Sequence, residues 1–245
     1  MELTVFGSNS AGNMYLLEND NEALLIEAGM RFVNIKRKLG NNISKISGCV
    51  ITHAHHDHGG YVLDVLKAGI NVYTSQGTID KMRVDSHRLK PVQANEMFTC
   101  GNFKIIPFDV AHDCKEPYGY YINHPETGNI LFVTDTFYIP NLFKGMSHVI
   151  IEANFDKNII QENFETGKIH LKVYERVHRS HMEIKTVCEF LKASDLSQVN
   201  NILLIHLSES NSNAKEFKSK IEGLTGKQTH IASKGLSINL SKKLF

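Results

Sequence analysis

The sequence predicts an α/β (α+β) protein in which two β-sheets pack face to face and helices cover their outer faces. Three observations support this prediction. The chain has 245 residues, 42% of them hydrophobic, which is enough to bury a large core. Each half begins with strand-like segments and then mixes strands with helices. No linker or break in composition divides the chain, so we expect one domain over residues 1–245.

In the first half, short apolar runs bounded by turn residues predict strands. These strands are expected at residues 3–8, 13–20, 22–29, 46–56 and 70–75. The turn ENDNEA fits a hairpin between the second and third of them. Apolar residues at helical spacing that end at a glycine predict helices at residues 31–40 and 61–69.

The second half follows the same pattern, with strands first and helices later. Strands are expected at residues 102–110, 118–124, 129–135, 148–154 and 200–208, with two short ones within 228–240. Helices are expected in a largely helical stretch that ends with residues 182–194, and again at residues 213–224.

Composition narrows the class of protein. Lys and Arg number 27 against 26 Asp and Glu, so the whole chain has no strong charge to attract nucleic acid. The cysteines are scattered without a C-x-x-C pair, and we expect them to be reduced. They are Cys49, Cys100, Cys114 and Cys188. No signal-peptide pattern and no membrane-length apolar run is present, so we expect a cytoplasmic protein without membrane association.

The stretch ITHAHHDHGG, residues 51–60, concentrates nitrogen and oxygen donors at the end of an apolar run. Alternate side chains of an extended segment share a face, so His53, His55 and Asp57 are expected to point one way. His58 follows where the chain turns toward the next helix. His56 is expected to face away, where it packs or supports the loop.

This donor set is typical of a metal site. A single histidine would be read as an ordinary solvated loop residue, but H-x-H-x-D-H at a strand end is far more specific. A mixture of imidazole and carboxylate suits Zn²⁺ or Mn²⁺, and the lack of thiolate argues against a purely structural zinc site.

Three further polar residues directly follow apolar strands. They are His112, Asp135 and His206. Any one of them alone would be read as a loop residue, but together with the cluster they form a consistent ligand set. Asp135 is the natural bridge because each of its oxygens can bind one ion. Two ions about 3.5–4 Å apart can hold a shared hydroxide as the nucleophile of a hydrolysis reaction.

With these residues in place, the chain resembles the metallo-β-lactamase superfamily over almost its whole length. The similar motifs include GSNSAGN, LLIEAG, VITHAHHDHGG, AHDCKEPYGY, LFVTDT, IIEANFD, RSHM and IHLSESNSN. The set is most similar to the YycJ/WalJ-like branch, whose members are implicated as DNA exonucleases, and also to transfer-RNA 3′-processing nucleases. The resemblance implies a four-layer αββα sandwich with the site at the open edge between the sheets.

The resemblance also implies how two divalent ions, Zn²⁺ or Mn²⁺, are bound. One ion would have His53, His55 and His112 as ligands. The other would have Asp57, His58 and His206, with Asp135 shared between the two.

Two positions depart from the pattern of the superfamily. Glu27 stands in LLIEAG where members usually have an aspartate that supports the cluster loop, which puts that contact in doubt. Phe137 stands in TDTF where glycine is common, so the loop after Asp135 is expected to differ in shape.

Asp57 and His181 are the residues we expect to be catalytic. Related nucleases place a histidine just before the helix that begins near residue 182 and use it to protonate the leaving oxygen. An imidazole titrates near neutrality, as this role requires. The alternative for His181 is an ordinary helix-start residue at the surface.

The favoured substrate is nucleic acid, with DNA favoured over RNA and exonuclease-like cleavage of the phosphodiester. Cations near the expected site are candidates for phosphate contacts, although a solvated helix face is an equal alternative. They are Lys168, Lys172, Arg176 and Arg179. The segment between His112 and Asp135 reads as a short hairpin and leaves no room for the long arm of the transfer-RNA nucleases.

Two other functions stay open. The same two ions could hydrolyse a small ester, thioester or lactone, although no extra C-terminal substrate domain of the thioesterase type is evident. The chain could also be a degenerate member that binds nucleic acid without cutting it, but the complete ligand set argues against this.

Overall fold

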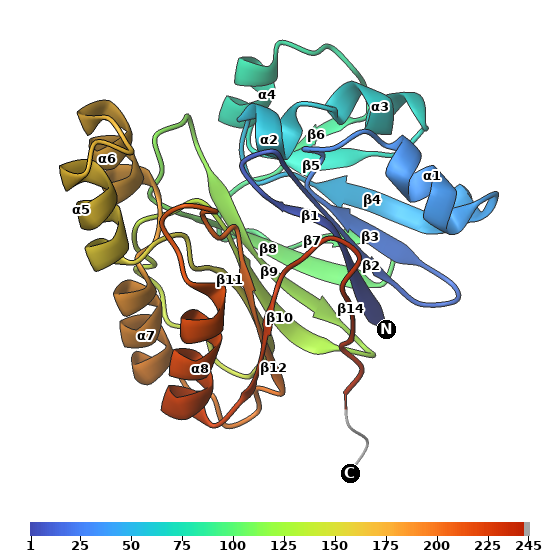
Figure 1. Ribbon diagram of the computed structural model, residues 1–245. Coiled ribbons are helices and arrows are strands. Elements are labelled where there is room, and N and C mark those ends of the chain that lie inside the picture. Colours follow the sequence, from blue (N-terminus) through green and yellow to red (C-terminus); the bar gives the residue numbers. More distant parts are fainter. Residues whose placement is uncertain (243–245) are drawn as a thin grey trace.

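A computed structural model describes residues 1–242 and contains two seven-stranded mixed sheets that pack face to face (Figure 1). The last three residues of the predicted 1–245 domain lie outside this description. The first sheet has the order β14 (Ser237–Asn239), β1 (Glu2–Asn9), β2 (Gly12–Glu18), β3 (Ala23–Ile26), β4 (Ile46–Val50), β5 (Val72–Thr74), β6 (Leu89–Pro91). The second has the order β13 (Gln228–Ile231), β12 (Asn201–Ile205), β11 (Met146–Glu152), β10 (Gly128–Val133), β9 (Tyr118–His124), β8 (Phe103–Asp109), β7 (Phe98–Cys100).

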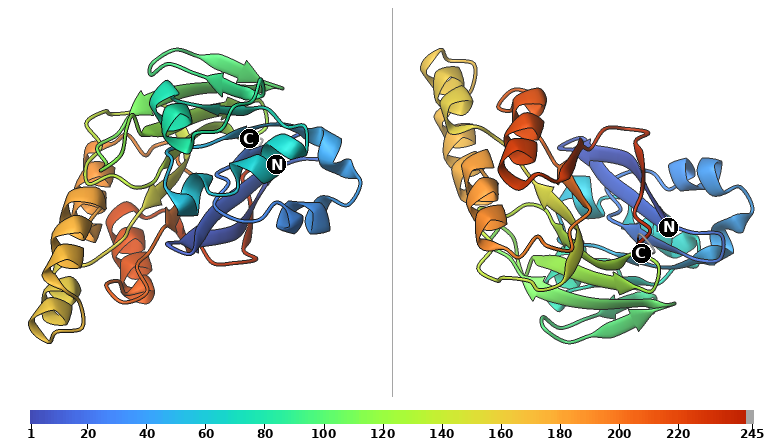
Figure 2. Two further views of the ribbon diagram at one scale, coloured as in Figure 1. Left: turned by 90° about the horizontal axis from the view of Figure 1, so that it is seen from above. Right: turned by 90° about the horizontal axis from the view of Figure 1, so that it is seen from below.

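Helices cover the outer faces of both sheets, as the sequence predicts (Figures 1 and 2). On the first sheet lie α1 (Val33–Leu39), α2 (His56–Gly59), α3 (Val62–Lys67) and α4 (Gln76–Met82), with a 3₁₀ turn at Asn42–Lys45. On the second lie α7 (Ile184–Ala193) and α8 (Ala214–Thr225), while α5 (Lys157–Glu165) and α6 (Leu171–Ser180) pack against each other in a separate apolar cluster (Figure 1). Within residues 1–242, no helix has the length and apolar character needed to cross a membrane.

Three elements, α2, α4 and β6, are not among those expected from the sequence, and β7 falls in the region of about residues 96–134 that is expected to contain several strands. The helix α4 begins where the Ser75 hydroxyl accepts a hydrogen bond from the Thr78 backbone N–H at 3.0 Å. Such a cap stabilises a short helix whose apolar pattern is weak. The strands β6 and β7 have three residues each, too few to show a clear alternation.

The core contains three large apolar layers and one small cluster formed by Phe155, Ile160 and Val177. One layer lies between the two sheets and includes Leu17, Tyr120 and Phe132. A second lies under α7 and α8, and a third lies under α1 and α3. Each fully buried Leu, Ile or Phe side chain in these layers contributes about 1.5–3 kcal/mol to stability. This rigid frame fixes the strand ends at one edge of the sandwich.

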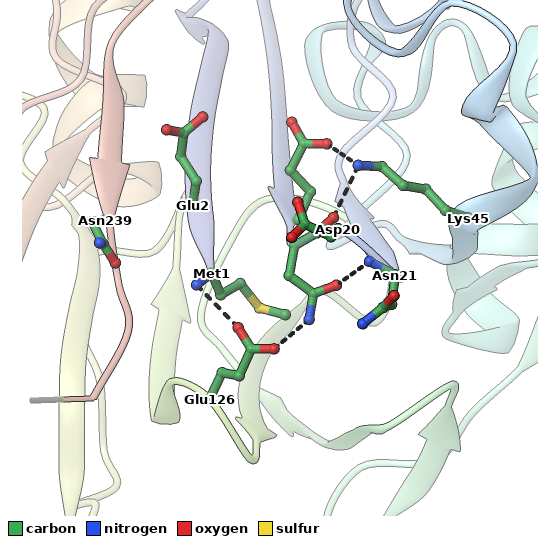
Figure 3. Close-up of a pocket in the computed structure, with 9 residues that line it drawn as sticks. Met1, Glu2, Asp20, Asn21, Lys45, Glu126 and Asn239 are labelled. Atoms are coloured by element: carbon green, nitrogen blue, oxygen red, sulfur yellow. Dashed lines mark hydrogen bonds and ion pairs between the residues drawn. The ribbon is translucent and has the colours of Figure 1, made fainter. Parts of the chain in front are cut away.

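A polar cavity of about 430 Å³ lies at the opposite end of β1 from that edge (Figure 3). Two of its acidic side chains have close partners: Lys45 pairs with Glu18 at 2.6 Å, and the Asn19 amide donates to Glu126 at 2.5 Å. These contacts link the β2–β3 hairpin to neighbouring segments. The histidine cluster is not part of this cavity.

Candidate metal centre

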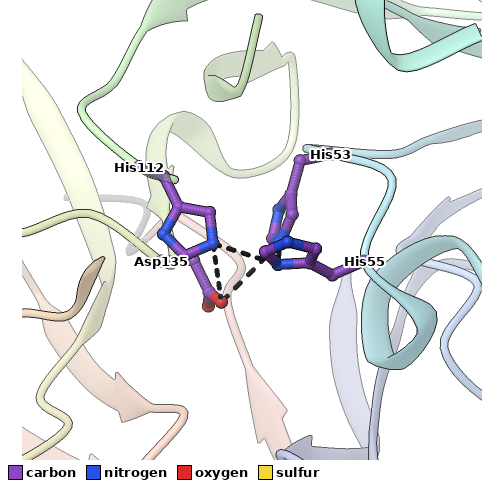
Figure 4. Close-up of side chains that lie close together, drawn as sticks. All are labelled: His53, His55, His112 and Asp135. Atoms are coloured by element: carbon purple, nitrogen blue, oxygen red, sulfur yellow. Dashed lines mark hydrogen bonds and ion pairs between the residues drawn. The ribbon is translucent and has the colours of Figure 1, made fainter. Parts of the chain in front are cut away.

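All seven residues predicted as ligands lie together where strands end at the open edge between the sheets. Within each of two groups, the potential ligand atoms lie within 4.8 Å of one another. The first group, shown in Figure 4, is His53, His55, His112 and Asp135; the second is Asp57, His58, His206 and Asp135. We call the first three histidines the His53 site and the trio Asp57, His58 and His206 the His206 site. Asp135 belongs to both groups.

The local route to this geometry differs from the expected strand alternation for Asp57. The strand β4 ends at Val50, and α2 begins at His56. A helical turn therefore positions Asp57 and His58. His56 is exposed, lies outside both groups, and has its ring 5.5 Å from that of Tyr61.

The backbone turns sharply at three of the strand ends. Glu27, Asp135 and His206 have φ angles of 67°, 39° and 52°, in the left-handed region that side chains with a Cβ rarely occupy. Such conformations cost about 1–3 kcal/mol each and persist where the surrounding structure enforces them. These turns direct the Asp135 carboxylate and the His206 imidazole into the cluster and place the Glu27 carboxylate beneath it.

In the His53 site the histidines are supported by neutral groups. The Thr52 hydroxyl lies 2.9 Å from His53 Nδ1. His112 Nδ1 lies 2.9 Å from the Ser180 carbonyl and donates to it, which leaves His112 Nε2 facing the cluster. Burial lowers the pKa of His53 and of His55, so both are held in the neutral form that binds metal.

In the His206 site, by contrast, ionised carboxylates face protonated histidines. Burial raises the pKa of Asp57, but hydrogen bonds from His206 and His58 outweigh it and hold that pKa well below its ordinary value. Burial lowers the pKa of His206, yet Asp135 and Asp57 raise it to about 10. Protons therefore compensate the carboxylates in this site, and a divalent cation would take over that role.

Buried Glu152 supports the His206 site, although it was not among the predicted residues. Its Oε1 lies 2.6 Å from His181 Nδ1 and 3.5 Å from His206 Nδ1. Its Oε2 accepts hydrogen bonds from the Thr136 and Met182 backbone N–H groups. Glu152 ends β11 in the motif IIEAN, which is the same polar-after-apolar signal that identified Asp135.

Glu27, the departure from the usual aspartate, makes the contact that the sequence placed in doubt. Its side chain is fully buried, and its Oε1 accepts a hydrogen bond from the Thr52 hydroxyl at 2.6 Å. Its carboxylate also lies 3.5 Å from His58 Nδ1. The nearby Gly29 has no side chain, and any Cβ there would collide with the Asp57 carbonyl. The motif LLIEAG therefore supports the loop of the cluster directly.

A cavity of about 220 Å³, which we call the centre cavity, opens onto both groups. His181 lines it, with its ring stacked on His206 at 5.4 Å between centroids. Burial lowers the pKa of His181, but Glu152 outweighs this and raises it. Asp113, also missing from the predicted set, lines the cavity with its Oδ1 3.2 Å from His112 Nε2.

Of the four candidate phosphate contacts, only Arg176 lines the centre cavity. Lys168, Lys172 and Arg179 do not, and Arg179 pairs with Glu175 at 3.2 Å. Phe137 is 47% exposed, and its backbone N–H donates to the Ala111 carbonyl. The loop after Asp135 is thus joined to the segment that positions His112.

The donor set fits a pair of divalent cations. Five imidazoles and two carboxylates converge, and further buried carboxylates lie behind two of the imidazoles. Buried carboxylates at this density are costly unless positive charge compensates them. The mixture of nitrogen and oxygen ligands suits zinc or manganese, and the centre cavity would give a substrate access to the ions.

The fold and this site define a hydrolase of the metallo-β-lactamase fold. Residues 23–207 match the family model described as a β-lactamase superfamily domain, and the chain belongs to that family.

Similar proteins support the same assignment. Exodeoxyribonuclease YycJ of Bacillus anthracis is 28% identical over 234 residues, which cover 89% of this chain and 86% of that protein. Exodeoxyribonuclease WalJ of Streptococcus pneumoniae serotype 2 is 25% identical over 229 residues, covering 87% and 84%. The crystal structure of the metallo-β-lactamase fold protein YhfI from Bacillus subtilis superposes with a TM-score of 0.69 at 16% identity, covering 97% and 99%.

Proposed function

We propose that this protein is a dinuclear metal-dependent phosphodiesterase that cleaves DNA in an exonuclease-like manner. The main support is the pair of donor groups that share Asp135 and lie beside His181. The similarity to proteins named exodeoxyribonucleases favours DNA among the possible phosphodiesters. His53, His55 and His112 would hold one Zn²⁺ or Mn²⁺ ion and Asp57, His58 and His206 the other, with Asp135 shared.

The chain supplies the remaining chemistry through a few side chains. When bound, the ions activate water for attack and neutralise charge that develops on the phosphoryl oxygens. Glu152 accepts the Nδ1–H of His181 and raises the pKa of this imidazole, so the imidazolium carries a second proton at Nε2 and delivers it to the leaving oxygen. Arg176 places a positive charge at the rim of the centre cavity, where it binds a phosphate oxygen.

The proposal is tested by an activity screen of the metal-free protein reloaded with Zn²⁺ or with Mn²⁺. The substrates are 5′-labelled single- and double-stranded DNA, RNA, bis-p-nitrophenyl phosphate and a thioester. We expect cleavage of DNA with release from an end. Hydrolysis of the thioester alone would overturn the phosphodiesterase assignment.

The matched variants are Asp135→Asn, at the shared ligand, and Asp20→Asn, an exposed aspartate at the other end of the sandwich. Because Asp135 belongs to both groups, its loss should cost more than the 10- to 100-fold typical of residues that only support a ligand. Bound metal per chain should fall as well. Asp20→Asn should keep both activity and metal, and unchanged activity in Asp135→Asn would exclude the proposed centre.

A further inference from the structure

A second cavity of about 420 Å³ adjoins the centre cavity, and we call it the α6 groove. The two cavities share Ser10, Arg176, His181 and His206 in their walls. The α6 groove is lined by residues of the helix α6 and by residues 9–11 and 207–211. A volume in this range is typical of sites that hold one small molecule or one unit of a polymer.

The α6 groove is lined by a stripe of residues at helical spacing. Ile169, just before α6, and Val173 line the groove, Arg176 lines both cavities, and Ser180 lines the centre cavity. Residues three and four apart lie on the same side of a helix. The stripe therefore runs from apolar side chains, far from the ligand groups, to polar side chains beside them.

The polar end of the stripe has unused hydrogen-bonding capacity. The Ser180 side chain is 1% exposed, and its hydroxyl has no hydrogen-bond partner within residues 1–242. Arg176 forms no ion pair with the described residues, in contrast to its neighbour Arg179. An arginine without a carboxylate partner in the walls of both cavities suits an anionic ligand such as a phosphate.

We propose that the α6 groove binds the nucleoside on the leaving side of the scissile phosphate, as a single unpaired nucleotide. His181 lies at the junction of the two cavities. If His181 protonates the leaving oxygen, the departing nucleoside extends from that junction into the groove. Arg176 then binds a phosphate oxygen, and Ile169 and Val173 contact the base.

The groove favours one unpaired nucleotide because of its limited volume. A cavity of about 420 Å³ is in the range for one nucleotide, whereas a base pair with both backbones needs more volume. Enzymes that act within such pockets take the nucleotide out of the duplex before reaction. This inference rests on the proposed phosphodiesterase function and adds to it a strand preference and the residues that determine it.

The test compares Val173→Asp with Leu171→Asp. Both residues are exposed on α6, at 39% and 53%, but only Val173 lines the groove. The substrates are a single-stranded oligodeoxynucleotide and the same strand with an abasic residue on the leaving side of the cleaved bond. We expect Val173→Asp to raise KM for the intact strand roughly tenfold, equivalent to the loss of one favourable base contact, with kcat little changed. Leu171→Asp should match wild type.

The abasic strand separates this inference from the proposed function. Wild type should cleave it roughly tenfold less efficiently than the intact strand, and Val173→Asp should lower that efficiency no further. If wild type cleaves no phosphodiester, the proposed function fails. If wild type cleaves both strands equally, or Leu171→Asp matches Val173→Asp, the α6 groove is not the nucleoside site.

A binding measurement tests the polar end of the groove without turnover. Fluorescence anisotropy with the labelled single strand in EDTA compares Arg176→Ala with Arg37→Ala, which removes an exposed arginine from α1 on the first sheet. Arg176→Ala should weaken binding of both the intact and the abasic strand roughly tenfold, because phosphate contacts do not read the base. Equal affinities for the two variants would contradict the role of Arg176.

Discussion

The His53 site and the His206 site differ in what supports their histidines. In the His53 site, a threonine hydroxyl and a backbone carbonyl contact the outer nitrogens of His53 and His112. In the His206 site, the buried carboxylates of Glu27 and Glu152 lie 3.5 Å from the outer nitrogens of His58 and His206. Neutral partners orient an imidazole, whereas carboxylates also increase its basicity.

The two proposed metal sites are therefore not equivalent. Basic imidazoles that face Asp57 and Asp135 favour a strongly held cation in the His206 site. The His53 site has neutral imidazoles, and its His55 side chain is 41% exposed. We therefore expect the ion in the His53 site to exchange first with a chelator, and the ion in the His206 site to leave last.

Among the variants that test this comparison, Glu152→Gln is expected to have the largest effect on activity. The change removes the charge behind both His206 and His181, so activity should fall 10- to 100-fold, as for other partners of metal ligands. Glu152 raises the pKa of His181, so that pKa should fall in the variant. A proton donor is active below its pKa, and the decline of kcat/KM on the alkaline side should therefore begin at lower pH. The pH profile of kcat/KM measures this shift.

A structural role alone would not move that pH profile. If Glu152→Gln lowers activity equally at every pH, Glu152 only holds the fold of the site. Release of the last metal ion by a chelator provides the second measurement, and it should be faster in the variant than in wild type.

A smaller effect is expected from Glu27→Gln. Glu27 contacts His58 but not His181, so metal affinity of the His206 site should weaken roughly tenfold while the alkaline limb of the pH profile stays in place. Competition with a metal indicator measures the affinity. A shift of the pH profile equal to that of Glu152→Gln would show that the two carboxylates act through a common network.

The sequence predicted the sandwich because buried strands and amphipathic helices have clear local patterns. It also predicted which residues come together, since each ligand follows an apolar strand. Glu152 shows the same local signal in IIEAN, and its role became clear only from its contacts with His181 and His206. Asp113 has no such signal, because it is a half-exposed residue in a loop.

Local patterns could not determine how α2 positions Asp57. The turn at His56 depends on the backbone of Ala28 and Gly29, which are distant in sequence: the Ala28 N–H donates to the His58 carbonyl, and Gly29 makes room for that of Asp57. The α6 groove likewise depends on a long-range contact, between α6 and residues 207–211. Such features arise from packing between segments far apart in the chain.

The smallest effect is expected on stability, at His148. This histidine lies outside the metal centre, and its hydrogen-bond partners are neutral, like those in the His53 site. His148 Nε2 donates to the Leu240 carbonyl at 2.9 Å, and the Asn201 amide donates to its Nδ1. Burial lowers the pKa of His148 to about 4, from an ordinary value of about 6.5. The unfolded chain therefore binds a proton more readily, and stability present above pH 6.5 is lost as the pH falls toward 4.

Between pH 8 and pH 6 this loss amounts to about 1 kcal/mol in the free energy of unfolding. Urea titrations of the metal-free protein at the two pH values measure it, with His148→Gln as the comparison because glutamine does not titrate. Wild type should lose about 1 kcal/mol more than the variant over this interval. An identical loss in both proteins would mean that neutral partners do not keep a buried histidine uncharged in this fold, and the same explanation for the His53 site would fall with it.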